Sequence, residues 1–433
     1  MRWLDLFRFP PERRKAIWGW VMYDWANSAF ATTVMVAVLP VYYHAIASPV
    51  LGDARTTAYW GYTASIALLI VALLTPVLGA IADQKGRKKL FLTAFALLGM
   101  FGTALLYFVY TGDWLKASLF YIIGNVGFAA ANVFYDALLP HVAREDEVDI
   151  VSTLGYAMGY LGGGILLAIN LAMIMLAPEE QKGLMTRLSL LSVAVWWFVF
   201  TIPLWKWVPE PPARPNPKWA GLNPVVAGFR QLAETFREIR KFSELLKFLI
   251  AFWFYNDGIS TIIKMATIYG SEIGLKETDL IGTILMVQFV GIPFSLLFGY
   301  LAKRIGAKRG LYLAISVYIL ITIGAYFMRE AWHFWLLGFG VAMVQGGSQA
   351  LSRSLYSRLI PKSKSAEFFA FFSVSAKFAG IAGPAVVGVI TQTMGSGRNG
   401  ILAVILFFVV GLALLPWVDV EKGSAIARAE DAR

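Results

Sequence analysis

The chain of 433 residues contains no cysteine and only three histidines, His44, His141 and His333. Without a thiol it can form no disulfide, no thiol nucleophile and no cysteine-ligated zinc or iron–sulfur site. The histidines stand far apart in the sequence, so we expect them in loops or at helix ends. The sequence therefore predicts no bound metal and no cofactor.

Short motifs that mark ATP hydrolysis and membrane enzymes are also missing. The chain contains no G-x-x-x-x-G-K-[S/T] loop for nucleotide phosphates, no H-E-x-x-H and no G-x-S-x-G. A membrane enzyme that acts on lipid is the weaker alternative, because no cluster of His and carboxylates stands at a predicted membrane surface. The acidic stretch AREDEVD at 143–149 is expected to be a gate or a helix cap instead. We predict that the chain is not an enzyme.

Charged residues make up only 15% of the chain and hydrophobic residues 58%, whereas an ordinary soluble chain has about 25% and about 45–50%. This composition indicates a membrane protein. A helix needs roughly 20 mostly apolar residues to cross the hydrocarbon layer. Twelve such runs predict an all-α membrane protein, and they cover residues 17–43, 59–82, 90–111, 115–139, 151–176, 187–208, 245–270, 279–301, 311–328, 332–358, 367–391 and 400–418.

The net charge of +11 indicates the orientation of the spans rather than an affinity for nucleic acid. With twelve spans, both termini lie on one side of the membrane, and that side collects most of the 38 Lys and Arg. By the positive-inside rule this side is the cytoplasm. We expect a multi-pass protein of the inner membrane with both termini cytoplasmic. No removable signal peptide is expected, because the basic N-terminus leads into a long span without a small-residue cleavage site. Seven Lys and Arg fall on the opposite side: Arg55, Lys116, Lys182, Arg187, Lys276, Arg329 and Arg398.

Two similar blocks of six spans are joined by a polar linker. The Pro-rich stretch PEPPARPNPKWAGLNP follows the sixth span and precedes an amphipathic stretch from Val225 to Lys241. GAIADQKGRKK at 79–89 aligns with GYLAKRIGAKR at 299–309, and YDALLP at 135–140 aligns with YSRLIP at 356–361 at nearly the same offset. These matches indicate a duplication. They predict an N-terminal bundle over 1–209, a cytoplasmic linker with a surface helix over 210–243, and a C-terminal bundle over 244–433.

The loop between the second and third spans carries a longer motif. Gly79, Asp83, Gly86, Arg87 and Lys88 fit G-x-x-x-D-x-x-G-R-K, and in this the chain resembles the major facilitator superfamily. In the first span, YDWANSAFATTV is similar to the branch that contains the yeast vacuolar amino-acid effluxer of autophagy and its bacterial relatives. The resemblance implies twelve transmembrane helices in two pseudo-symmetric six-helix bundles and a function in secondary transport.

The motif is expected to act as a gate that latches one conformation. Its glycines allow a tight turn and close helix approach, and Asp83 can accept hydrogen bonds from a helix N-terminus. Its basic residues can pair with carboxylates or lipid phosphate. Asp136, near the cytoplasmic end of the fourth span, is assigned to the same gate. In the second half Lys303 stands where the first half has Asp83, so the paired gate is predicted to be asymmetric.

Six ionisable residues fall inside predicted spans, where a charge costs at least about 2.5–3.5 kcal/mol and therefore suggests a function. Helical spacing places polar residues in stripes on the first, fourth, seventh and tenth spans. In the superfamily that the chain resembles, these four spans line the central cavity. The six residues are Asp24, Asp136, Asp257, Lys264, Arg353 and Lys377.

Asp24 and Asp257 are predicted to load and release protons, because burial and a nearby cation can poise a carboxylate between its two forms. For Asp24, the alternative is a gate formed by local pairing with Lys15 or with another base at the cytoplasmic end. Arg353 presents a fork for carboxylates, whereas Lys264 or Lys377 offers a point charge or pairs with an Asp. The residues predicted to bind substrate are Asn27, Ser28, Asn132, Asn256, Lys264, Gln345, Gln349, Arg353 and Lys377.

These features predict a secondary active transporter that moves a small polar solute by alternating access and is coupled to protons. The family branch implies amino-acid efflux. Transport of sugars, organic anions or drugs is an alternative, and a sensor or lipid scramblase derived from the same fold is another. The expected partners are a small-molecule substrate, protons or another coupling ion, and the lipid bilayer. We expect a monomer, because the two-bundle architecture needs no second chain to form a cavity.

Overall fold

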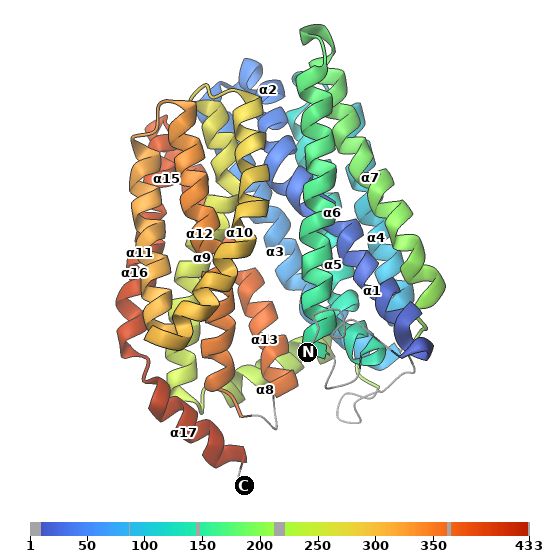
Figure 1. Cartoon of the computed structure of the whole chain (residues 1–433), viewed down its shortest axis with the longest axis vertical. Coiled ribbons are helices and arrows are strands. Elements are labelled where there is room, and N and C mark those ends of the chain that lie inside the picture. The colour runs from blue at the N-terminus through green and yellow to red at the C-terminus, as the bar shows by residue number, and fades with distance from the viewer. Residues whose placement is uncertain (1–9, 86, 144–147, 212–220, 362–364, 432–433) are drawn as a thin grey trace. The chain divides into compact units, whose positions relative to one another are not determined.

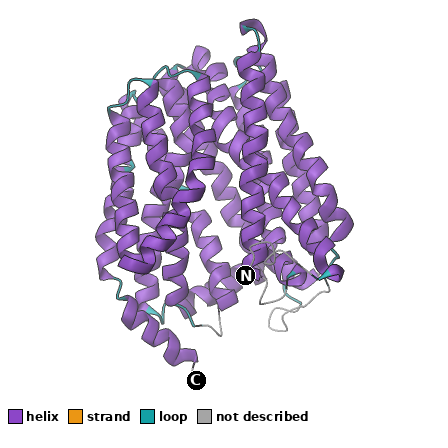
Figure 2. Ribbon diagram, viewed as in Figure 1, coloured by secondary structure: helices purple, strands orange, loops and turns teal. Residues whose placement is uncertain are grey.

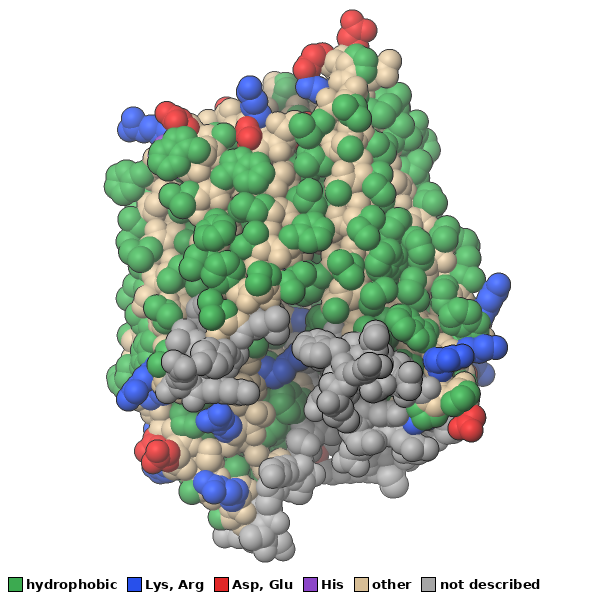
Figure 3. All heavy atoms as spheres, viewed as in Figure 1, with side chains coloured by type: hydrophobic (Ala, Val, Ile, Leu, Met, Phe, Trp, Pro, Cys, Tyr) green, Lys and Arg blue, Asp and Glu red, His purple; other side chains and the backbone are tan. Residues whose placement is uncertain are grey.

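A computed structural model describes residues 10–85, 87–143, 148–211, 221–361 and 365–431 of the chain. All regular structure within these residues is helical, and they contain no strand (Figure 2). The all-helical fold expected from the apolar runs is therefore confirmed. Ten helical segments in the described part are long and apolar enough to cross a membrane. On the face shown in Figure 3, hydrophobic side chains cover most of the surface and charged side chains are few.

Contacts group the chain into two compact units. The first comprises the described parts of 1–42 and 73–229, and the second those of 43–72 and 230–433. The helices α2 (Val38–Leu51), α3 (Asp53–Lys85) and α8 (Pro224–Ile239) contribute residues to both units. The first unit otherwise contains α1 (Pro11–Ala29), the π-helical segment Phe30–Ala37, α4 (Lys88–Leu105), α5 (Trp114–Val142), α6 (Val148–Leu176) and α7 (Lys182–Trp207) (Figure 1).

The second unit contains two long helices that are more polar than the ten apolar segments. They are α9 and α12, with 30 and 28 residues, and they carry the polar stripes predicted for the seventh and tenth spans. Polarity within a span of this length favours contact with protein or water over contact with lipid. The helices of this unit are α9 (Ser243–Glu272), α10 (Glu277–Ile305), α11 (Ala307–Tyr326), α12 (Ala331–Arg358), α13 (Ser365–Phe378), α14 (Ala382–Met394), α15 (Gly397–Ala403), α16 (Ile405–Leu414) and α17 (Val420–Asp431).

Close approach of α1 and α6 depends on two glycines one turn apart on α6. A Cβ atom built on Gly155 would lie 2.7 Å from the Asp24 carboxylate, and one on Gly159 would lie 2.5 Å from the Ser28 hydroxyl. Both distances are too short for a real contact, so a Cβ at either position would force the Asp24 or Ser28 side chain to shift. The polar side of α1 is therefore held against the backbone of α6.

The predicted first span is not a uniform α-helix, because Phe30–Ala37 is π-helical. Thr32 stands at the start of this segment, and its hydroxyl lies 3.2 Å from the Ser28 carbonyl and 3.3 Å from the Gly163 carbonyl of α6. A hydroxyl that competes for helix carbonyls disturbs the regular hydrogen-bond ladder. The disturbance follows directly after the stretch that carries Asp24, Asn27 and Ser28.

The predicted eleventh span is also interrupted. It is formed by α13 and α14, and the helix is broken between Phe378 and Ala382. Gly380 and Gly383 lie in and next to this break, followed by Pro384, which lacks the N–H that a continuous helix would use. A break within a span leaves backbone groups that must find other hydrogen-bond partners.

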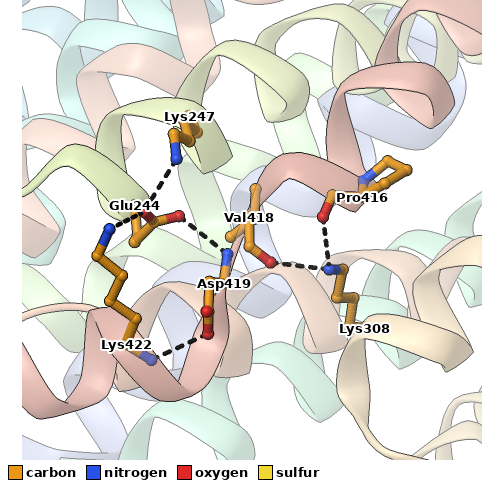
Figure 4. Close-up of polar contacts among 7 residues, drawn as sticks. All are labelled: Glu244, Lys247, Lys308, Pro416, Val418, Asp419 and Lys422. Atoms are coloured by element: carbon orange, nitrogen blue, oxygen red, sulfur yellow. Dashed lines mark hydrogen bonds and ion pairs between the residues drawn. The ribbon is translucent and has the colours of Figure 1, made fainter.

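Each unit contains a lysine that caps the end of a helix in an equivalent way. In the first unit, Lys89 Nζ donates to the Trp205 carbonyl at 2.7 Å and the Val208 carbonyl at 2.8 Å, at the end of α7. In the second unit, Lys308 Nζ donates to the carbonyls of Pro416 and Val418, at 3.1 and 2.7 Å (Figure 4). A cation at the C-terminal end of a helix satisfies carbonyls that have no partner within the helix.

The buried side chain of Glu244 connects the start of α9 to the C-terminal helix α17. Glu244 is 1% exposed, and its Oε2 accepts the backbone N–H of Asp419 at 2.9 Å (Figure 4). Its Oε1 lies 2.9 Å from Lys247 Nζ and 3.6 Å from Lys422 Nζ. A further bond joins the Ser424 hydroxyl to the Arg358 carbonyl at the end of α12. The short C-terminal helix thus holds the ends of α9 and α12 together.

Candidate functional site

Asp24 lies half-buried in the first unit, among aromatic side chains of α1 and α5. Its carboxylate and the Tyr135 hydroxyl both face Gly155, where a Cβ would lie 2.7 Å from Asp24 Oδ2 and 3.3 Å from the Tyr135 oxygen. The Tyr135 ring is stacked on Trp20 with the ring centres 4.2 Å apart, and Trp20 Nε1 donates to the Tyr135 carbonyl at 3.0 Å. The Asp24 carboxylate and the stacked Trp20 and Tyr135 side chains therefore lie next to the same glycine of α6.

One turn along α1, two amides join the same helices. Asn27 is 2% exposed, and its Nδ2 donates to Oδ1 of Asn132 on α5 at 2.7 Å. Asn132 precedes Tyr135 by three residues, so both project from one side of α5. Asp24, Asn27, Ser28 and Asn132 were all predicted from the sequence, and the structure brings them to the packed α1, α5 and α6 helices.

Asp257 forms a second polar centre, in the second unit. The residue is 4% exposed, and its Oδ1 accepts the backbone N–H of Gly383 at 2.9 Å and the Thr261 hydroxyl at 3.4 Å. Gly383 is the second residue of α14, so the carboxylate lies at the positive end of a helix within a span. A Cβ on Gly383 would lie 2.7 Å from this oxygen, so glycine is required for the contact.

Lys264 places a cation beside the same helix break. It is 9% exposed, and its Nζ lies next to Gly380, where a Cβ would be 3.4 Å away. Lys264 stands two turns after Asp257 on α9 and interacts with it electrostatically. The Lys264 carbonyl accepts a hydrogen bond from Trp60 Nε1 of α3 at 3.1 Å. A buried acid and a buried base thus share one location.

Side chains from two helices satisfy the backbone of the break. Asn256 Nδ2 of α9 donates to the Ala379 carbonyl at 3.4 Å, and the Ser65 hydroxyl of α3 donates to the Ile381 carbonyl at 2.9 Å. The helix α3 can approach so closely because it has Gly61, where a Cβ would lie 2.5 Å from the Pro384 carbonyl. We name Asn256, Asp257, Lys264, Ser65 and the backbone of 379–383 the break cluster.

The remaining predicted substrate residues lie outside the buried part of this cluster. On α12, Gln345 is half-buried, whereas Gln349 and Arg353 are exposed. Lys377 is half-buried and is the last residue but one of α13. Of the predicted basic residues, Lys264 lies within the break cluster.

The predicted gate motif is described only in part. Gly86 lies outside the described residues, as do the side chains at Gly79 and Asp83. Arg87 is exposed, and Lys88 Nζ lies 3.5 Å from the Ala137 carbonyl and 3.2 Å from His141 Nε2. Asp136, on α5, is exposed. The contacts of Lys88 join the start of α4 to the end of α5.

Sequence reasoning missed Tyr135, Trp60 and Ser65 as members of these two centres. Tyr135 is the first residue of the repeated YDALLP and YSRLIP stretches, so the repeat could have drawn attention to it. Trp60 and Ser65 gave no comparable signal, because an apolar span contains many aromatic and hydroxyl residues whose direction is not known. Among the described residues, no three His, Asp or Glu side chains gather as potential metal ligands.

Comparison with known proteins identifies the family. The family model described as "Vacuole effluxer Atg22 like" matches residues 48–149 and 147–428. The uncharacterized MFS-type transporter YxiO of Bacillus subtilis is 39% identical over 420 residues, which cover 95% of this chain and 97% of YxiO. Autophagy-related protein 22 of Coccidioides immitis is 25% identical over 540 residues, covering 96% of this chain and 89% of the fungal protein.

Solved structures confirm the fold expected from the repeat. The nucleoside transporter NupG, solved as a point mutant, superposes with a TM-score of 0.69 at 13% identity, covering 93% of this chain and 98% of NupG. A D-xylose-proton symporter superposes with a TM-score of 0.64 at 14% identity, covering 94% of this chain and 96% of the symporter. At these identities the likeness concerns the fold alone. The chain belongs to the family described as vacuole effluxer Atg22 like, and it is a multi-pass membrane transporter of the major facilitator superfamily.

Proposed function

We propose that the chain is a proton-coupled transporter that exports amino acids by alternating access. In this proposal it lies in the inner membrane with both termini cytoplasmic, the arrangement favoured by the distribution of Lys and Arg. The observation that carries the proposal is the break cluster, in which the buried Asp257 carboxylate accepts a backbone N–H at the start of α14. Asp24 is the second proposed proton carrier.

The surroundings of Asp257 have opposing effects on the ionisation of its carboxyl group. Burial disfavours the carboxylate, whereas the Gly383 N–H and the charge of Lys264 favour it. A change of structure that alters the balance between these influences would bind or release a proton at Asp257. Because Asp257 itself holds the backbone of the break, a change in its protonation would be coupled to the conformation of the eleventh span.

The predicted substrate-binding residues provide the charged and polar groups that an amino acid requires. Its carboxylate requires a cation, for which Lys264, Lys377 and Arg353 are the candidates, and its ammonium requires a carboxylate or amide oxygens. Within the second unit, Asn256, Gln345 and Gln349 would supply further polar contacts. The resemblance to vacuolar amino-acid effluxers favours this class over the sugars, organic anions and drugs that a similar fold also serves.

Counterflow in proteoliposomes with a panel of labelled amino acids tests the proposal. The native protein is compared with Asp257→Asn, first at equal pH on both sides and then under a pH gradient. The Asn side chain keeps an oxygen for the Gly383 N–H but binds no proton, so exchange should persist while gradient-driven accumulation is lost. Asp113→Asn is the matched control, because Asp113 lies in the loop before α5, paired with the exposed Lys116.

Three outcomes are informative. Exchange without accumulation in Asp257→Asn supports both the substrate class and the proton role. Equal accumulation in Asp257→Asn and native protein overturns the role of Asp257, and the measurement is then repeated with Asp24→Asn. If no amino acid exchanges while the protein remains folded and monodisperse, the amino-acid assignment is wrong, and the panel moves to sugars, organic anions and lipids.

A further inference from the structure

One face of α8 exposes large apolar side chains. Val225, Val226, Phe229 and Phe236 are 49%, 42%, 41% and 38% exposed. At about 100° per residue these four positions fall within roughly a third of the helix circumference. The helix spans Pro224–Ile239 and is therefore about 24 Å long. An apolar strip of this length on a water-exposed helix would be unfavourable, so the strip needs a partner.

The helix packs on the rest of the protein through a different face. Ala227, Thr235 and Ile239 are buried, at 1%, 4% and 0% exposure. Ala227 and Thr235 lie well away from Phe229 and Phe236 around the helix, whereas Ile239 lies at the border between the buried face and the strip. Phe236 also stacks on Phe371 of α13, with the ring centres 6.2 Å apart, but it stays partly exposed. The exposed part of the strip is therefore formed mainly by Val225, Val226 and Phe229.

Basic residues border the apolar strip. Arg230 and Arg237 are exposed and each directly follows a phenylalanine of the strip, so the two arginines lie on the same edge, two turns apart. Arg240 and Lys241 are also exposed and continue the positive charge beyond the end of the helix. An apolar face with a basic edge is the pattern of helices that lie at a membrane surface and attract anionic lipid.

The chain connections keep α8 near the membrane. The preceding helix α7 ends at Trp207, and α9, whose apolar run begins at Leu245, starts at Ser243. A helix that ends three residues before a membrane span cannot move far from the headgroup layer. The lipid surface is therefore the partner that lies nearest to α8, and the negative charge of anionic lipids complements the arginines.

We propose that α8 lies in the bilayer interface, with Val225, Val226 and Phe229 in the acyl region and Arg230 and Arg237 bound to anionic phospholipid headgroups. The proposal is independent of the transported solute. In this proposal α8, which lies in the segment joining the two halves of the chain, binds the membrane according to its lipid composition. The expected preference for anionic over zwitterionic lipid is about fivefold for each arginine.

The absence of cysteine makes the test direct, because one introduced thiol labels one position of the full-length protein. Phe229→Cys, carrying a bimane fluorophore, is reconstituted into nanodiscs that contain doxyl-labelled phosphatidylglycerol or doxyl-labelled phosphatidylcholine. Gln231→Cys, on the other side of the helix, is the matched control. We expect strong quenching at 229 and weak quenching at 231, with phosphatidylglycerol the better quencher at 229.

Removing the basic edge separates lipid charge from simple insertion. With Arg230→Gln and Arg237→Gln added, quenching at 229 should persist while the preference for phosphatidylglycerol disappears. Arg428→Gln on α17 is the control and should leave the preference unchanged. Equal quenching by both lipids in the native background overturns the headgroup assignment. Absence of lipid quenching at 229, with or without access for aqueous iodide, overturns the proposal altogether and indicates water or a protein segment at this face.

Discussion

Removal of the Glu244 carboxylate is expected to release the C-terminal helix. Glu244 is 1% exposed and accepts the Asp419 backbone N–H, which stands directly before α17. Glu244→Ala removes this acceptor and the counter-charge of two lysines. Glu244→Gln keeps an oxygen at the same place and removes the charge alone. The two variants therefore separate the hydrogen bond from the ion pairs.

The contacts set the size of the effect. A hydrogen bond to a charged group contributes about 1.5–3 kcal/mol, and the lower end applies because water can reach the exposed Asp419 when Glu244 is absent. The side chains of Lys247 and Lys422 are 44% and 60% exposed, so each pair adds only about 0.2–1 kcal/mol. Glu244→Ala should therefore weaken the docking of α17 by about 2–3 kcal/mol.

Limited trypsin digestion of the purified full chain in detergent measures this docking. Cleavage at Arg428 in α17 follows local opening, so a loss of about 2–3 kcal/mol should speed it by roughly 30- to 150-fold. Lys247→Met, which removes one exposed partner, should speed it only a few-fold. Cleavage of Glu244→Ala at the native rate, within a factor of about two, would refute the reasoning and place the attachment of α17 elsewhere.

Lowering the pH should weaken the docking of α17 in the native protein, as Glu244→Ala does. Burial raises the pKa of Glu244, but the Asp419 N–H and the two lysine charges outweigh burial and hold this pKa below its usual value. A lowered pKa in the folded state means that the carboxylate stabilises docking fully above its usual pKa of about 4.3, and that this contribution is lost as the pH falls through the lower folded value. Glu244→Gln should lack this acid-dependent loss.

Three further substitutions test packing and capping. Gly155→Ala should lower the thermal stability by about 1–3 kcal/mol and reduce transport, because its Cβ would lie 2.7 Å from the Asp24 carboxylate. Gly61→Ala should cost a similar amount, because the Pro384 carbonyl, 2.5 Å from the new Cβ, belongs to the backbone and cannot rotate away. Lys308→Met should lower stability by about 1–2 kcal/mol, because two carbonyls at the end of the last span lose their donor.

Controls for these substitutions exist in the chain. Gly183 lies near the start of α7 and has no atom within 4 Å of a Cβ built on it, so Gly183→Ala should be close to neutral in the same unfolding assay. Arg309→Met changes the exposed neighbour of Lys308 and should also be close to neutral. If Gly155→Ala or Gly61→Ala behaves like Gly183→Ala, the close helix contacts described above do not determine stability. A neutral Lys308→Met would show that water satisfies the same carbonyls.

The sequence by itself determined the class of the protein and much of its plan. Apolar runs of span length leave the backbone no alternative to helices in lipid, so an all-helical membrane protein followed from composition and periodicity. The repeated stretches at 79–89 and 299–309 indicated duplication. The acids Asp24 and Asp257 stood out for the same reason, since a charge inside a span is costly wherever the chain folds.

Tertiary structure decided which groups meet these acids. Asp257 contacts Gly383, which is 126 residues away, and the contact exists because α14 begins anew after a break in the eleventh span. Ser65 of α3 reaches the same break only because Gly61 allows two helix backbones to approach. Sequence spacing defines the face of a helix on which a residue lies, but it does not define the neighbour that the face meets. That choice depends on packing between distant segments, where the presence or absence of a single Cβ decides whether a polar contact can form.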